Sequence, residues 1–292
     1  MNYSKSALFS GLCVLFMLTG PALARNREVA TLSFGYEGKA RLTDLESENG
    51  VASVEMVETG ARLNFPLYIG DRARVISGFG FKHTRFDFCN VGIERQDVYT
   101  VSIPFRTFFD ISPKWSFMGS LFPSLYSDFE GVKYDDFKAA AVALGFYEWR
   151  PDCKIALGAA YSREFGRDAF YPAAGFTWTP SDKWIVNMLF PRPNVVYKLN
   201  HDTDVFVFAV PAGGEWNINE RIEDGKKVAF DLSLKGYRAG TGCSYSFSDR
   251  ISLKIEGGLM FGRNYELRND DETVFESAIK DTWFVECGIA LQ

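Results

Sequence analysis

Apolar side chains recur at every second position along most of the chain. A period of two is that of a β-strand, whose successive side chains point to opposite faces of a sheet. Segment 183–190 shows the pattern clearly, with Trp184 and Val186 on its apolar face, and segment 195–199 resumes it. Prolines stand between the two segments, and proline cannot donate a hydrogen bond to a β-ladder. The two segments are therefore predicted to form a hairpin whose turn is 191–194.

Twelve other links, together with this turn, divide the chain into fourteen alternating segments. Within 228–247 the apolar positions change phase near Gly236, which predicts a β-bulge there or a division into two strands by a turn at 238–240. The strand number is therefore predicted as about 14, with about 12 or 16 as alternatives. The segments are 29–38, 51–67, 72–82, 97–109, 114–127, 137–149, 153–163, 169–179, 183–190, 195–199, 204–216, 228–247, 251–262 and 281–291.

The links between these segments alternate in length. The short links, such as 70–71 and 180–182, are rich in the residues of tight turns. The intervening links are mostly longer and charged, so short turns are predicted at one end of the sheet and long loops at the other. The turn 191–194 falls at the long-loop end, where it is the one very short connection. The long links are 39–49, 83–96, 128–136, 217–227 and 263–280, with a medium link at 164–168.

The first 24 residues have the pattern of an export signal. Lys5 supplies a positive charge, 7–18 is apolar, and the small residues of 22–24 form a cleavage site. The apolar run is shorter than the ~18 residues that a membrane-spanning helix needs. The sequence therefore predicts a signal peptide at 1–24 and a mature barrel domain at 25–292.

The tryptophans lie on the apolar faces of the predicted strands, near the strand ends. Indole rings favour the membrane–water interface, where the ring is in an apolar environment and its N–H is hydrated. Two aromatic girdles are therefore predicted, one beside the short turns and one beside the long links. Trp115, Trp149, Trp178 and Trp184 belong to the first, and Trp216 and Trp283 to the second.

Strands of ~10 residues with one apolar face, unequal loops and an export signal together predict a transmembrane antiparallel up-and-down β-barrel in a bacterial outer membrane. A soluble secreted β-protein would also show the alternation, but its tryptophans would be scattered along the strands. The C-terminal sequence departs from the barrel pattern, because it ends in Gln292 rather than in an aromatic residue.

Several short motifs resemble an uncharacterised family of bacterial outer-membrane β-barrel proteins, known as a domain of unknown function. The resemblance covers most of the mature chain and implies the same fold, but it implies no activity. The motifs are Trp184 with Phe190-Pro191-Arg192-Pro193 and Tyr197, then Gly213-Gly214-Glu215-Trp216, and Glu256-Gly257-Gly258 with Phe261-Gly262-Arg263.

If the apolar faces meet lipid, the opposite faces line the interior of the barrel and carry charges of both signs. Such charges need partners or water. They fit an open lumen that selects small polar solutes and, equally, a paired network that fills a closed barrel. The residues predicted to line the lumen are Arg74, Arg106, Lys154, Asp231, Lys235, Lys254, Glu256 and Glu286.

The sequence offers little support for catalysis. His83 and His201 are the only histidines, and they are predicted at opposite ends of the barrel, where they cannot share a metal ion or a triad. The cysteines show no metal-ligand spacing, and no cofactor is predicted. The net charge is −5, or −6 without Lys5, so a basic face for nucleic acid is absent.

We therefore expect a passive, porin-like channel whose partners are outer-membrane lipid and small polar solutes, and not an enzyme. A closed structural barrel that binds a partner through its long acidic loops is the alternative. Arg192, at the short connection between long loops, is expected to affect access or lipid contact rather than folding.

Overall fold

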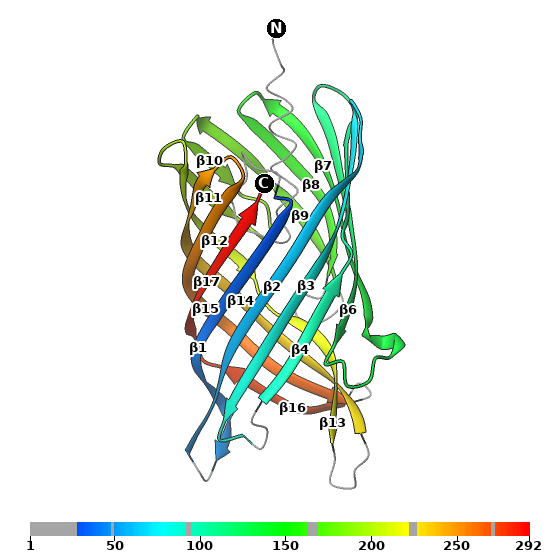
Figure 1. The fold of residues 1–292 in the computed structure, drawn as a ribbon, viewed down its shortest axis with the longest axis vertical. Helices are drawn as coiled ribbons and strands as arrows, with labels where there is room; N and C mark the ends of the chain where they lie inside the picture. The colour runs from blue at the N-terminus through cyan, green and yellow to red at the C-terminus, as the bar shows by residue number, and fades with distance from the viewer. Residues whose placement is uncertain (1–27, 48–49, 92–94, 163–168, 222–226, 270–271) are drawn as a thin grey trace.

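In a computed structural model, the chain forms one antiparallel β-sheet that closes on itself (Figure 1). The structure describes residues 28–47, 50–91, 95–162, 169–221, 227–269 and 272–292, so the predicted signal peptide lies outside the described residues. None of the described residues belongs to a helix that is long and apolar enough to cross a membrane.

The strands, in chain order, are as follows. They are β1 (Ala30–Ser47), β2 (Gly50–Ile69), β3 (Ala73–Cys89), β4 (Arg95–Ser102), β5 (Phe105–Asp110), β6 (Trp115–Ser127), β7 (Phe137–Arg150), β8 (Cys153–Ser162), β9 (Ala169–Ser181), β10 (Trp184–Asn187), β11 (Asn194–Lys198), β12 (Thr203–Pro211), β13 (Gly214–Arg221), β14 (Lys227–Ser248), β15 (Ile251–Asn269), β16 (Glu272–Ile279) and β17 (Thr282–Leu291), with a 3-10 turn η2 (Tyr134–Asp136) before β7.

These segments build a ring of about 14 hydrogen-bonded strands, because three of the ring's strands are interrupted. The segments β4 and β5 both pair with β3 and β6, β12 and β13 both pair with β14, and β16 and β17 both pair with β15 and β1. The ring closes between β1 and β17, in a register that runs from Ala30 opposite Leu291 to Glu37 opposite Phe284. The predicted fold class and strand number are confirmed.

The wide end of the barrel carries the C-terminus and the short turns, at the top of Figure 1. In this part the outward side chains are apolar and exposed, as are Leu32 and Phe34 on β1 and Leu63 on β2. The inward positions of the same strands are Ser33, Gly35 and other small or polar residues. This is the polarity of a strand with lipid on its outer face, and we call this part the apolar band.

Toward the narrow end the polarity of the strands reverses. On β3 the exposed Phe79 faces outward and Lys82 faces inward, whereas further along Asp87 faces outward and Phe86 and Phe88 are buried inside. Because a strand turns successive side chains to opposite faces, β3 keeps its facing and only its surroundings change. Beyond the apolar band the strands therefore continue into water as a barrel with a polar outside and an apolar inside, which we call the extension.

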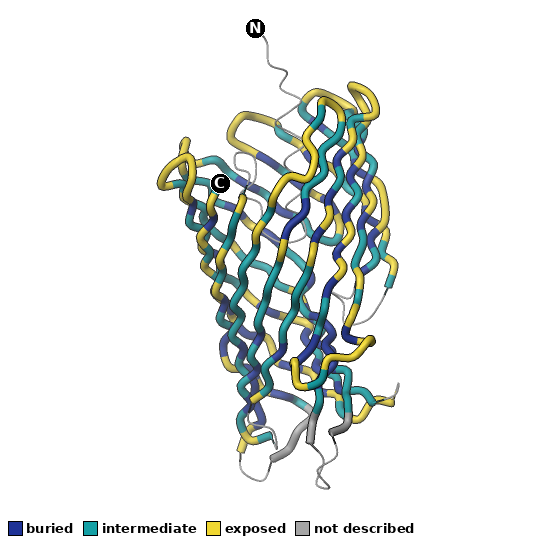
Figure 2. Tube along the Cα trace, turned by 45° about the vertical axis from the view of Figure 1, so that its right-hand side comes forward, coloured by how far each residue is buried: buried dark blue, intermediate teal, exposed yellow. Residues whose placement is uncertain are grey.

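The extension encloses a packed apolar core, and Figure 2 shows buried positions gathered toward this end. Phe86 and Leu42 are fully buried there, and Phe86 packs edge-on against Trp216 and Tyr265. The core comprises Ala40, Leu42, Ala52, Val54, Met56, Phe86, Phe88, Val98, Trp216, Ile218, Leu232, Leu234, Tyr265, Leu267 and Ile279.

The extension corrects the prediction of long loops. Much of 39–49, 83–96, 217–227 and 263–280 is strand, since β1, β3, β13 and β15 run well past the predicted ends. Their outward residues are charged because they face water. The charged residues were interpreted as belonging to loops. The link 128–136 does lie outside the strands and contains η2, and 164–168 lies outside the described residues.

The phase change predicted near Gly236 has a different origin from a bulge in that strand. Leu234 and Arg238 both face inward, so β14 is one strand without a change of facing. The register against β15 does shift between Lys235 and Tyr237, but the extra residue is on β15, where Gly262 has φ of 60°. The apolar residues change face because β14 crosses from the extension into the apolar band.

Five strands of the ring, β7 to β11, take no part in the extension. Their neighbours β6 and β13 meet beyond their ends, on the side of the extension, where Asn217 lies opposite Ser127 in a parallel bridge. Asp128 fixes this contact, because its N–H donates to Asn217 O at 3.3 Å and its carboxylate accepts from the N–H of Asn219 at 2.5 Å. The barrel is thus narrower in the extension than in the apolar band.

Candidate functional site

A cavity of about 360 Å³ lies inside the barrel, between the core of the extension and the wide end. Trp216 and Leu234, which belong to that core, close the cavity on the side of the extension. Its polar wall comes from β1, β2, β14, β15 and β17, whose inward residues include Glu37, Glu58, Arg238, Lys254, Glu256 and Glu286.

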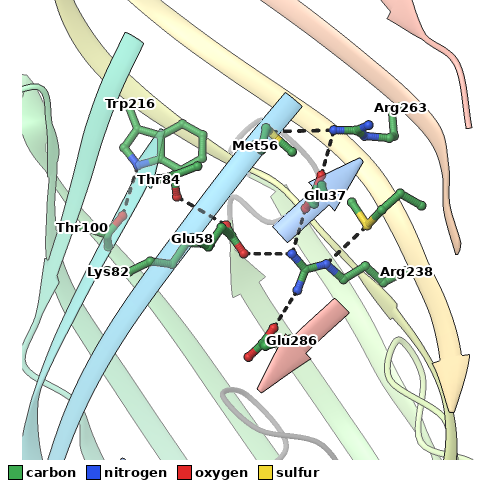
Figure 3. A network of polar contacts seen from close by, with 11 residues as sticks. Glu37, Met56, Glu58, Lys82, Thr84, Thr100, Trp216, Arg238, Arg263 and Glu286 are labelled. Atoms are coloured by element: carbon green, nitrogen blue, oxygen red, sulfur yellow. Dashed lines mark hydrogen bonds and ion pairs between the residues drawn. The ribbon is translucent and has the colours of Figure 1, made fainter. Parts of the chain in front are cut away.

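Arg238 is the centre of an ion-pair network in this wall (Figure 3). Its Nη2 donates to Glu37 Oε1 and to Glu58 Oε2, both at 2.8 Å, and its Nη1 donates to Glu286 Oε2 at 3.1 Å. The guanidinium also lies over the ring of Phe284, 5.0 Å from its centre. One side chain of β14 therefore joins this strand to β1, β2 and β17.

Two further cations extend the network. Arg263, whose side chain is 1% exposed, donates to the other oxygen of Glu37 at 2.9 Å. Lys82 pairs with Glu58 at 2.5 Å, and Thr84 donates to the same carboxylate at 3.3 Å. Buried charges are tolerated when each is paired and hydrogen-bonded, so this arrangement holds β1, β2, β3, β14 and β15 in register below the core.

Trp216 differs from its predicted position. It is 2% exposed, lies inside the barrel and donates its indole N–H to Thr100 Oγ1 at 3.1 Å. Because its strand has already entered the extension, the apolar ring belongs to the interior and not to a lipid interface. The other five tryptophans predicted for the girdles are exposed between 38% and 59%, namely Trp115, Trp149, Trp178, Trp184 and Trp283.

The structure places most of the predicted lumen residues on inward faces. Lys254 and Glu256 form an ion pair in the cavity wall, and Lys254 also lies 5.3 Å from the ring centre of Phe206. Arg74 lies over the ring of Phe108, and Arg106 over that of Phe122, both at 5.7 Å. Lys154 faces Glu148 at 3.7 Å on the neighbouring strand.

Asp231 and Lys235 do not line the lumen and correct the prediction. They alternate with Leu232 and Leu234, which are buried in the core, so their own side chains face outward. Lys235 pairs there with Glu266 at 3.2 Å. These residues belong to the extension, where water and not lipid surrounds the outer face.

Sequence reasoning missed the network around Arg238. Arg238 alternates with the outward Tyr237 and Ala239, so its inward position was available from periodicity, as was that of Glu58. Arg263 was placed in a loop because the strand was ended at Gly262. That three carboxylates meet at Arg238 depends on ring closure, for which the sequence carries no local signal.

Both histidines lie away from the cavity. His83 is on the outer face of β3, with Nε2 2.6 Å from Asp97 Oδ1, and His201 is in the turn after β11, 2.8 Å from Asp202. Among the described residues, no three His, Cys, Asp or Glu side chains are grouped as metal ligands. Partial burial would raise the pKa of Asp97, which lies beyond the apolar band, but hydrogen bonds from Arg95, His83 and Arg85 hold it at about 2.

The hairpin of β10 and β11 borders the cavity. Its register runs from Trp184 opposite Tyr197 to Asn187 opposite Asn194, as the alternation predicted. Asn187 and Asn194 are buried on the inner face and are joined by a hydrogen bond of 3.0 Å. Arg192, just beyond this pair, lines the cavity.

Comparison with protein families gives one match, which extends over residues 27–291 and is described as a domain of unknown function, DUF6268. The chain belongs to this family. The resemblance drawn from the sequence motifs is thereby confirmed. A search of curated proteins found no match.

Solved structures similar to this DUF6268 chain include outer-membrane proteins of low sequence identity. An outer membrane channel, COG4313, from Pseudomonas putida F1 has 8% identity and a TM-score of 0.49, covering 91% of this chain and 96% of that one. The P. putida toluene transporter TodX has 10% identity and a TM-score of 0.42, covering 99% and 93%. Outer membrane phospholipase A from Escherichia coli has 10% identity and a TM-score of 0.37, covering 97% and 98%.

Proposed function

We propose that the protein is a passive channel in a bacterial outer membrane, where it admits small solutes into the cavity of the barrel. The observation that carries the proposal is the cavity of about 360 Å³, with charged residues in one wall, inside a ring whose outer face is apolar. A cavity of this size lies at the small end of the range for ligand sites, so the solutes are small molecules.

The apolar outer face supports the location in a membrane. Exposed Leu, Ile, Val and Phe side chains surround the wide part of the barrel, and tryptophans lie at its margins. A water-soluble protein would expose a large continuous apolar surface in this arrangement, at a considerable cost in free energy. The partner of this face is therefore outer-membrane lipid.

Solute entry is tested by swelling of proteoliposomes in small sugars and amino acids. Ser102 lines the cavity, whereas the adjacent Val101 is on the opposite face of β4. Ser102→Trp is expected to reduce the swelling rate because the indole occupies the cavity, and Val101→Trp, its matched control, is expected to leave the rate unchanged. A wild-type protein that is folded yet causes no swelling would refute the passage of polar solutes.

A closed structural barrel is the second candidate, and the packed core of the extension favours it. Phe86, Met56 and Leu42 are buried inside the narrow end, where an open pore would need water. This candidate predicts no swelling for wild-type protein that still shows the heat-modifiable gel mobility of a folded barrel. Swelling by vesicles that contain folded protein therefore rejects the closed barrel.

A further inference from the structure

One edge of the barrel wall lacks a strand partner within the part of the chain that the structure describes. The N–H of Ala209 donates to Pro193 O at 3.1 Å, where β12 leaves the tip of the β10–β11 hairpin. The next backbone bond on that side is from Asp128 N–H to Asn217 O at 3.3 Å. Between these bonds, Val210 to Gly214 make no ladder contact on this side with a described residue. We call this opening the side window.

The sequence of this edge allows it to remain open. Pro211 has no N–H to satisfy, and the N–H of Ala212 donates to Gly236 O at 2.9 Å on the other side of the strand. Gly213 has φ of 147°, in the region that favours glycine, and it ends the regular course of β12 before β13 begins. The edge therefore leaves few unsatisfied backbone donors beside the membrane, where each would be costly.

The cavity reaches the side window from within. Pro211, Ala212 and Gly213 line the cavity on one side of the window. Ala140, near the start of β7, and Arg192, at the hairpin tip, line it on the other side. The route along the barrel axis through the extension is blocked, because Trp216 and Leu234 close the cavity on that side and the core lies behind them. Movement through the window displaces no residue of the packed core.

The window lies at the margin of the apolar band, because Pro211 is opposite the exposed Tyr237 and Gly214 is opposite Leu234 of the core. Around it the outward side chains are Phe190 at the hairpin tip, Val207 on β12 and Tyr237 on β14, which are 53%, 53% and 44% exposed. The end of the window nearer the apolar band therefore faces lipid acyl chains. A molecule that leaves through it must be soluble in lipid, because an ion or a sugar would lose its hydration there.

We propose that solutes leave the cavity sideways through this window into the outer leaflet, and that they are small apolar or weakly amphipathic molecules. This inference rests on the proposed function and deepens it, since it names the exit and the solute class. The charged wall beside the window, where Arg238 is the cross-strand neighbour of Val210, then contacts the polar end of an amphipathic solute. The apolar part of the solute faces Phe122, Phe208 and Met260 of the cavity.

The test follows entry of the apolar dye N-phenyl-1-naphthylamine into intact bacterial cells that express the protein. The dye fluoresces once it reaches the membrane interior. Expression of wild-type protein is expected to raise the rate of entry several-fold over cells without it. Ala212→Trp should return the rate to that baseline, whereas Leu63→Trp, on the lipid-facing side of β2 and away from the window, should not.

A reversible block guards against misfolding of the tryptophan variant. Ala212→Cys is folded first and then modified with a bulky methanethiosulfonate reagent, which should slow dye entry, and reduction of the mixed disulfide should restore it. The same reagent applied to wild-type protein controls for the native cysteines. Dye entry that is unaffected by either block at position 212, with protein present in the membrane, would overturn the window.

The outcomes for the window and for the channel can be told apart. Swelling in sugars that Ser102→Trp reduces, with no dye entry, leaves the channel standing and removes the window. Dye entry that Ala212→Trp abolishes, with no swelling in sugars, supports the window and its solute class and rejects passage of polar solutes. Absence of both rejects the proposed function.

Discussion

Replacement of Arg238 by methionine is expected to destabilise the barrel, and the magnitude can be derived from the ion pairs that remain. The methionine keeps much of the volume of the side chain but removes the cation that three carboxylates share. Glu37 would retain Arg263 at 2.9 Å, and Glu58 would retain Lys82 at 2.5 Å. Glu286 would be left without a cation within ion-pair distance among the described residues.

The magnitude follows from that single unpaired group. Removal of one partner from a buried ion pair costs about 3–5 kcal/mol. Glu286 is 29% exposed and borders the cavity, so partial solvation places the expected loss at the lower end, about 3 kcal/mol. Glu286→Gln in the Arg238→Met background is expected to restore a large part of the loss, because no uncompensated charge remains.

The assay is equilibrium unfolding of the purified protein in phospholipid vesicles with guanidinium chloride, followed by tryptophan fluorescence. The wild type, both single variants and the double variant form a cycle whose interaction term measures the coupling between Arg238 and Glu286. A loss below about 1 kcal/mol for Arg238→Met, or no recovery in the double variant, would refute the view that Arg238 is held chiefly by charge.

Three other substitutions test the core, the hairpin and the window edge. Phe86→Ala in the core is expected to lower the free energy of unfolding by about 3–5 kcal/mol, and Phe79→Ala, on the lipid face of the same strand, by clearly less, in the same unfolding assay. Asn194→Ala removes the hydrogen-bond partner of the buried Asn187 and is expected to cost about 1–3 kcal/mol, with Asn194→Asp as a variant that keeps an acceptor. Gly213→Ala is expected to reduce the yield of heat-modifiable barrel, because φ is 147° and a Cβ would lie 2.1 Å from a carbonyl oxygen of β14, whereas a normal yield would show that this backbone can relax.

Local alternation was sufficient for the part of the barrel that meets lipid. From β6 to β9 the predicted segments agree closely with the observed strands. The short hairpin of β10 and β11 is also present, although β10 ends at Asn187 and not at position 190. In this part the outer face is uniformly apolar, so the polarity of a residue indicates whether its side chain faces outward or inward. Lys254, Glu256 and Glu286 were assigned to inward faces by this reasoning, and the structure places them in the cavity wall.

The same reasoning failed where the solvent changes along a strand. It ended β3 and β15 too early and assigned Asp231 and Lys235 to the wrong face, because it took every apolar face to be a lipid face. Periodicity gives the two sides of a strand but does not say which side is outside. The sense reverses between the apolar band and the extension, and no single residue marks the boundary.

The sequence by itself determined the class of fold, the number of strands and the position of the short hairpin, since all three depend on the period of two and on turn residues that act locally. Only the tertiary structure decided that the narrow end is sealed by a core, that Arg238 joins Glu37, Glu58 and Glu286, and that β6 meets β13 above the side window. The physical reason is that these features arise from closure of the ring, which brings together residues whose contacts leave no periodic trace in the chain.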